Sequence, residues 1–207
     1  MTEQAQNALL KTIEEPPVYA IIILLTENCD SLLPTIRSRC VTLTMNPVEK
    51  DKICTYLENK FQLEPEQAQI AANYCQGNIG KAIRFASSSD FIEMKNQVLK
   101  LLKNLDSMDI ASIIDTIKEF STHKNDINDY LDLMLLWYRD VLMFKVTKDA
   151  NLLLYSDEYS AISEQATKRD YENIENIIAA IDKAKVRLKA NVNFDVTIEL
   201  MILAMKD

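Results

Sequence analysis

The chain has 207 residues, 48% of them hydrophobic, and a formal net charge of −8. This length allows one or two domains with sizeable cores. The acidic balance argues against a protein whose main task is to wrap nucleic acid, because phosphate binding needs clustered Lys and Arg. It leaves open a subunit that touches DNA only inside a larger assembly.

The composition favours a mainly α fold. The chain contains 2 glycines, against an average usage of about 7%, so few tight left-handed turns are expected. Leu, Ile, Ala, Lys, Glu and Gln are abundant and are good or acceptable helix formers. No stretch approaches the roughly 18 apolar residues of a membrane-spanning helix. Glu3 and the absence of a basic region before it argue against a signal peptide.

Residues 1–45 have the pattern of a small α/β region. Thr2 can cap a helix that ends near Glu14, before two prolines. The continuous apolar run at residues 19–25 predicts a buried strand. A helical turn within residues 32–40, ending at an Arg, is expected to separate it from a second short strand at 41–43. Two strands make a poor sheet, so this region is expected to be the remnant of a larger α/β domain.

The rest of the chain is expected to be helical. Residues 46–89 predict three short helices, with Pro47 at the start of the first, Gly77 as a C-terminal cap and a serine linker at 87–89. Residues 90–207 predict about five longer helices, with a polar loop at 148–169 that contains one short helix. The expected helices cover about 47–61, 65–75, 79–86, 91–102, 110–120, 126–147, 171–188 and 194–205.

Two motifs near the N-terminus carry a resemblance to a known family. Residues 6–17 read QNALLKTIEEPP and residues 33–40 read LPTIRSRC. Together with the apolar run between them they resemble the AAA+ clamp-loader subunits of DNA polymerase III. In that family the Ser-Arg-Cys arginine is a finger inserted into the ATP site of a neighbouring subunit. The resemblance therefore implies that Arg39 is an arginine finger that acts in trans.

Physical chemistry alone leaves two interpretations of Arg39 open. A guanidinium between two strand ends can reach an anion, but most arginines are simply solvated. A single Arg would suffice for catalysis in trans, because it neutralises charge that spreads over the transferred phosphoryl group. Arg37, two residues earlier, would point elsewhere and is interpreted as a structural or intersubunit residue.

The resemblance also implies a domain organisation. Residues 1–45 would be the remnant of the AAA+ domain with its sensor 1 and Ser-Arg-Cys region, residues 46–89 a helical lid, and residues 90–207 a helical collar for oligomerisation. The phosphate-binding Walker A loop of the family would precede the position of Met1. No cofactor is therefore expected in this chain, and ATP with Mg²⁺ would bind in the neighbouring subunit. No catalytic activity is expected of the chain alone.

The implied partners are the other parts of a clamp loader. They are the motor subunits gamma or tau and the delta subunit, with the sliding clamp and primed DNA bound through the assembly, and no membrane. Two alternatives remain: a gamma/tau-type motor subunit fragment, and a helical protein–protein adaptor unrelated to nucleotides. Unpaired edges of the incomplete sheet would favour self-association.

The segment Gly77-Asn78-Ile79-Gly80-Lys81 is not a phosphate loop, since a Walker A motif needs four residues between its glycines and a Ser or Thr after the Lys. It resembles the family's sensor 2 motif, where motor subunits carry an Arg at the position of Gly80. This departure implies a non-motor subunit. Lys81 and Arg84 are interpreted as solvated helix residues rather than nucleotide ligands.

Other candidate groups favour ordinary structural roles. Residues 26–28 match the family's sensor 1 position, but a turn is the preferred interpretation. Glu14 and Glu15 are expected to be solvated rather than a metal pair, and Trp137 with Tyr138 to pack in the core rather than stack on bases. The four cysteines, Cys29, Cys40, Cys54 and Cys75, form no C-x-x-C pair. We expect reduced, mostly buried thiols of a cytoplasmic protein and no metal site.

Overall fold

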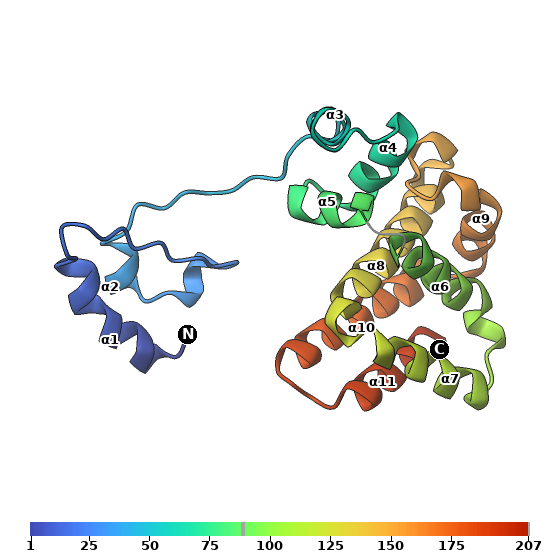
Figure 1. The fold of residues 1–207 in the computed structure, drawn as a ribbon. Coiled ribbons are helices and arrows are strands. Elements are labelled where there is room, and N and C mark those ends of the chain that lie inside the picture. Colours follow the sequence, from blue (N-terminus) through green and yellow to red (C-terminus); the bar gives the residue numbers. More distant parts are fainter. Residues whose placement is uncertain (88–89, 207) are drawn as a thin grey trace. The chain divides into compact units, whose positions relative to one another are not determined.

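The computed structural model describes residues 1–87 and 90–206 (Figure 1). These residues form helices, turns and coil, and no β-strand occurs among them. The prediction of a mainly α fold is confirmed. Internal contacts divide the chain into two compact units, Met1–Asn46 and Pro47–Asp207.

The first unit contains one regular helix and two short ones. Helix α1 spans Glu3–Glu14 and is capped, as predicted, by Thr2, whose Oγ1 accepts a hydrogen bond from the Ala5 amide at 3.3 Å. The 3-10 helix η1 spans Cys29–Ser31, and α2 spans Pro34–Arg37 with its proline in the favoured first position. Ile36 of α2 is fully buried.

The two predicted strands are not formed. Residues 20–26 and 41–45 are irregular, and their apolar side chains face solvent: Ile21 is 89% exposed, Leu25 92% and Val41 89%. A strand is stable only when its backbone N–H and C=O groups find a ladder partner. The described residues supply no such partner, so sequence patterns typical of buried strands give exposed coil here.

The second unit begins with three short helices, as predicted. They are α3 (Lys50–Phe61), α4 (Pro65–Tyr74) and α5 (Ile79–Ser87). The start of α3 was predicted at Pro47 and lies at Lys50. The reason is a contact distant in sequence, in which the Val48 amide donates to the Gly77 carbonyl at 2.9 Å. Gly77 has φ +80°, and a Cβ there would lie 2.5 Å from the Pro47 Cβ, so this turn requires glycine.

Six further helices lie in the described residues 90–206, five long ones and one short one in the 148–169 segment, which confirms the predicted pattern. Helix α8 runs through their centre and contacts α6, α9 and α10, while α11 packs on α7 and α10 (Figure 1). They are α6 (Asp90–Asn104), α7 (Ile110–Thr122), α8 (Ile127–Thr147), α9 (Tyr159–Lys168), α10 (Tyr171–Lys189) and α11 (Phe194–Lys206). Short 3-10 turns lie between them: η2 (Leu105–Ser107), η3 (Lys124–Asp126), η4 (Ala150–Leu152) and η5 (Ser156–Glu158).

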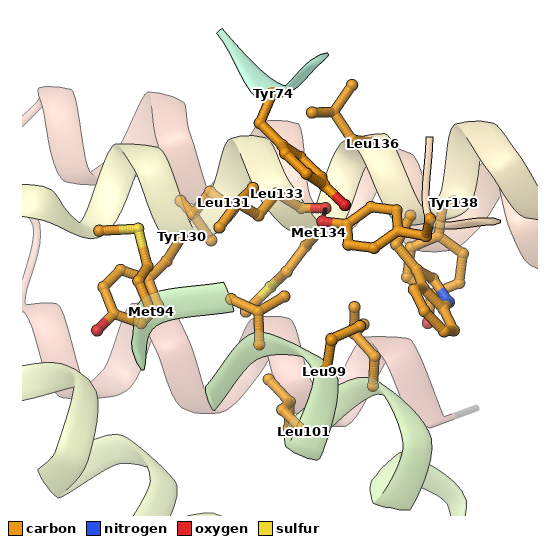
Figure 2. Close-up of a cluster of buried hydrophobic side chains, with 14 of the residues drawn as sticks. Tyr74, Met94, Leu99, Leu101, Tyr130, Leu131, Leu133, Met134, Leu136 and Tyr138 are labelled. Carbon is orange, nitrogen blue, oxygen red and sulfur yellow. Dashed lines mark hydrogen bonds between the residues drawn. The ribbon is translucent and has the colours of Figure 1, made fainter. Parts of the chain in front are cut away.

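One buried apolar cluster extends through the second unit, from Ile53 of α3 to Met205 of α11. Figure 2 shows its middle, where side chains of α4 and α6 meet α8. Trp137 and Tyr138 are fully buried, and the Trp137 Nε1 donates to Gln165 Oε1 at 3.0 Å. The prediction that these aromatic residues pack in the core is confirmed. The predicted linker at 87–89 lies partly outside the described residues, and the division between 46–89 and 90–207 stays a prediction.

The cysteines are all free thiols, but the expectation that most are buried is wrong. Cys75 is buried and Cys54 is half-buried, whereas Cys29 and Cys40 are exposed. The exposed pair belongs to the first unit, where Ile36 is the one apolar side chain in the buried class. In the described part of the chain, every helix is too short or too polar to cross a membrane.

Candidate functional site

Arg39 lies just after α2, and the first unit itself holds its guanidinium. Its side chain is 40% exposed. The Nε atom lies 2.6 Å from Glu14 Oε1, at the end of α1. The Nη1 atom donates to the Thr35 carbonyl at 2.9 Å and to Ser38 Oγ at 3.3 Å. Among the described residues none accepts a hydrogen bond from Nη2, so this nitrogen can bind an external acceptor.

A buried glutamine brings the two halves of this arrangement together. The Gln6 Oε1 atom accepts from the Leu33 amide at 2.8 Å, and its Nε2 donates to the Ser31 carbonyl at 3.1 Å. Gln6 is 4% exposed, so these bonds replace its lost hydration. They connect α1, which ends at Glu14, to the segment η1–α2, which Arg39 follows.

Glu14 is exposed to solvent, as the sequence interpretation expected, but that interpretation missed its ion-pair partner. Its carboxylate is an ion-pair partner of the candidate finger. The signal was present in the sequence as an acidic residue in one motif and a basic residue in the other. Its meaning depended on the fold, because the pair forms only when α1 and α2 lie side by side.

Arg37 behaves differently from Arg39. Its Nη1 lies 3.0 Å from Asp30 Oδ1, and the side chains are 47% exposed for Arg37 and 83% exposed for Asp30. This contact fits the structural interpretation of Arg37. Residues 26–28 form the turn that was expected: Asn28 Oδ1 accepts from the Asp30 amide at 2.8 Å, and Thr26 Oγ1 accepts from the Asn28 amide at 3.2 Å.

Lys81 and Arg84, in the second unit, form ion pairs with α8. Lys81 Nζ lies 2.8 Å from Asp129 Oδ1 and also bonds Asp132, which accepts a second bond from Lys185 of α10. Arg84 Nη2 lies 2.9 Å from Asp129 Oδ2. The expectation of solvated residues is wrong for Lys81, whose side chain is 23% exposed. The arrangement joins α5, α8 and α10 and gives both cations protein partners.

The pKa values of this network follow from competition between burial and charge. Burial by itself would raise the pKa of the Asp132 carboxyl, but the hydrogen bonds from Lys185 and Lys81 outweigh it and lower that pKa. Burial would lower the pKa of Lys81, but hydrogen bonds to Asp129 and Asp132 outweigh it and raise that pKa. Both shifts favour the charged forms of Lys81 and Asp132 at neutral pH.

No described group of three His, Cys, Asp or Glu side chains is placed to hold a metal ion. Gly80, at the second position of α5, presents no side chain at all. The chemistry that the described candidate residues offer is thus concentrated in Arg39, a half-exposed cation with one guanidinium nitrogen available. Such a group can stabilise negative charge on an anion bound next to it.

Comparison with known proteins gives one consistent result. Residues 1–49 match the family model described as DNA polymerase III, delta subunit. DNA polymerase III subunit delta′ of Bacillus subtilis (strain 168) is 32% identical, over 100% of this chain and 63% of that protein. The tau subunit of the same bacterium is 26% identical, over 68% of this chain and 29% of that protein. The gamma subunit of Buchnera aphidicola subsp. Schizaphis graminum is 22% identical, over 98% of this chain and 62% of that protein. The chain spans less than two thirds of each of these relatives.

Proposed function

Since the chain is a relative of the DNA polymerase III clamp-loader subunits delta-prime, tau and gamma, we propose that it is a non-motor subunit of the delta-prime type. In this proposal Arg39 is an arginine finger for the ATP site of an adjacent subunit, during loading of the sliding clamp onto primed DNA. The observation that carries it is the position of Arg39: half-exposed, held by Glu14 and Thr35, inside the segment that matches the family model.

Two features support the delta-prime type over a motor subunit. The alignment with a delta-prime relative runs over the whole chain at the higher identity, 32% against 26% for tau. Gly80 also provides no side chain at the position where the resemblance places the nucleotide-contacting Arg of motor subunits. Lys81 and Arg84 do not replace it, because Asp129 and Asp132 already pair with them.

The physical role proposed for Arg39 needs no catalytic apparatus in this chain. As the phosphoryl group leaves ATP, negative charge spreads over its oxygens, and a guanidinium inserted beside them is worth on the order of 10³–10⁵ in rate. The nucleotide, with Mg²⁺, would be bound by the neighbouring gamma or tau subunit. The delta subunit, the clamp and primed DNA would be reached through the assembly, in the cytoplasm.

The test is the ATPase activity of a reconstituted assembly that contains the cognate motor subunit, delta, clamp and primed DNA. The chain is added unaltered, as Arg39→Ala, or as Arg37→Ala, a matched control from the same turn. We expect the unaltered chain and the control to stimulate hydrolysis equally. Arg39→Ala should bind the assembly with unchanged affinity and give at least about tenfold less stimulation.

Other outcomes would favour the alternatives. If the chain does not bind the motor and delta subunits, a helical adaptor with other partners becomes the better interpretation. If Arg39→Ala stimulates as well as the unaltered chain, the chain acts in a clamp loader without using Arg39 as a finger. If the chain itself binds ATP with an affinity that Lys81→Ala abolishes, the motor-subunit alternative gains.

A further inference from the structure

We infer that Glu14 is a positioning residue that holds the Arg39 guanidinium in the orientation needed for its work in trans. The inference rests on the proposed function of Arg39 and adds a role for a residue on a different helix. Its basis is the contact of 2.6 Å between Glu14 Oε1 and Arg39 Nε, between the last residue of α1 and the residue after the α2 cap.

The pair does little for the stability of the unit. Both side chains are close to half exposed, at 46% for Glu14 and 40% for Arg39. Exposed ion pairs contribute little to stability, since solvent screens them and holding two long side chains costs entropy. The connection between α1 and α2 is already made by the buried Gln6, through its hydrogen bonds with Ser31 and Leu33. The ion pair therefore orients a side chain on a platform that forms without it.

The contacts of the Arg39 guanidinium indicate that Glu14 orients this group and leaves part of it free to bind an anion. Glu14 meets the inner nitrogen, Nε, and the Thr35 carbonyl accepts from Nη1, so two sides of the planar group are fixed. Nη2 has no acceptor among the described residues. A phosphate oxygen could bind at this outer nitrogen while the inner contacts remain. A long Arg side chain loses rotamer freedom when it docks, and prior restraint reduces that loss.

The test compares Glu14→Ala, Glu14→Gln and Glu15→Ala in the same reconstituted ATPase assay. Glu15 is the matched control, because it is the next acidic residue and lies outside the Arg39 contact. We expect Glu14→Ala to lower the stimulated kcat about tenfold with unchanged binding to the assembly. Glu14→Gln keeps an oxygen at the same place and should recover most of the rate. Glu15→Ala should match the unaltered chain.

A double variant separates this inference from the proposed function. If Arg39 works through the contact, Glu14→Ala should add nothing in the Arg39→Ala background. A loss with Arg39→Ala but none with Glu14→Ala would overturn the positioning role and leave the finger in place. A loss with Glu14→Ala that persists in the Arg39→Ala background would show that Glu14 acts by another route. If neither variant has an effect, both the finger and its positioning fail.

A measurement on the isolated chain gives an independent check. The Nε–H group of Arg39 can be followed by ¹⁵N–¹H NMR and assigned by its loss in Arg39→Lys. We expect Glu14→Ala to move this signal and to speed its exchange with water severalfold, because a paired N–H is protected. Glu15→Ala should leave it in place. An Nε–H signal that is identical with and without the Glu14 carboxylate would contradict the inference.

Discussion

The two units of the chain place their large apolar side chains differently. In residues 47–206 these side chains form one buried cluster that reaches from α3 to α11. In residues 1–46 Ile36 is the one apolar side chain in the buried class, whereas Val18, Tyr19, Ile21 and Leu25 are each at least 89% exposed. The stabilising contacts thus lie mainly in one unit and the candidate finger in the other.

This difference has a consequence for how the site is built. With little buried area, the first unit depends on polar connections, above all on the hydrogen bonds of Gln6 with Ser31 and Leu33. Regions with few buried apolar contacts open locally at low free-energy cost. The orientation of Arg39 is therefore set by a few specific bonds, and the helices of the second unit hold together by burial. A substitution in one unit should therefore lower the stability of that unit and leave the other unchanged. The loss should be largest where the substitution removes the most buried contacts.

The largest expected effect comes from the core of the second unit. Trp137→Ala removes a fully buried indole and its hydrogen bond to Gln165, and it should cost about 3–5 kcal/mol of unfolding free energy. Trp137→Phe, which keeps most of the ring volume, should cost clearly less. Urea denaturation followed by circular dichroism measures both. If Trp137→Ala reduces hydrogen-exchange protection in α1 as much as in the helices of the second unit, the two units unfold together.

The ion network between α5, α8 and α10 should have the next largest effect. Asp132 accepts from Lys81 and Lys185, and its side chain is 24% exposed. Asp132→Ala leaves two partly buried ammonium groups without this partner and should cost about 2 kcal/mol at pH 7. Asp182→Ala, an exposed acidic residue on α10, is the matched control and should change the urea midpoint little.

The same network predicts a pH dependence with a definite sign. The folded-state pKa of Asp132 lies below the unfolded value, so its contribution is complete above about pH 5 and is lost as the pH falls through the folded pKa. The pKa of Lys81 is raised, so its contribution is present below the unfolded pKa and is lost only at strongly alkaline pH. The difference between unaltered chain and Asp132→Ala should shrink between pH 6 and pH 2.5. A constant difference would mean that Asp132 stabilises the fold by packing alone.

Much of the second unit could be predicted from its sequence because its information is local. Apolar residues at helical spacing gave helices α4 to α8, α10 and α11, with Pro65 at the first position of α4. The short helix α9 was expected in the polar segment 148–169 without bounds. The exception was the start of α3, where Pro47 and Val48 are held by the distant Gly77. Such a contact leaves no periodic signal in the sequence.

The site could be predicted only in part, since its remaining features join distant residues. Arg39 was identified through a motif, but its contact with Glu14 and the role of Gln6 require α1 and α2 to be in place. The contact of Lys81 with Asp132 spans 51 residues. The predicted strands at 19–25 and 41–43 did not form, although their sequence pattern was clear. Their apolar pattern predicted buried strands, but the described chain offers nothing that buries these side chains.

Gln6 provides a smaller and more local test of the comparison. Gln6→Ala removes three side-chain hydrogen bonds, two of them to the segment η1–α2, and leaves the Leu33 amide without its acceptor. The loss should cost about 1 kcal/mol of local stability. Hydrogen exchange at Leu33 and in α1 should become severalfold faster. The urea midpoint of the second unit should stay the same. Gln4→Ala, an exposed glutamine of the same helix, is the control. Unchanged exchange at Leu33 would show that Gln6 does not join α1 to α2.

A substitution in the exposed apolar run at residues 18–25 should change the stability least, but it should clearly reduce self-association of the chain. The exposed apolar run at residues 18–25 is larger than the scattered apolar side chains that are normal on a surface, and such runs favour contact between molecules. Ile23 is 75% exposed, so Ile23→Lys should change the unfolding free energy by less than about 0.5 kcal/mol. It should nevertheless reduce self-association, because it adds a charge to the centre of the run.

Light scattering over a range of concentrations measures this directly. The unaltered chain should show an average mass above that of the monomer at high concentration, and Ile23→Lys should lower it. Ile92→Lys is the matched control: Ile92 is 64% exposed on α6, outside the run, and its replacement should leave the association unchanged. A strictly monomeric mass of the unaltered chain would contradict the expected association. An equal reduction by Ile92→Lys would show that the added charge lowers the association wherever it is placed, and that the run at residues 18–25 is not the specific contact.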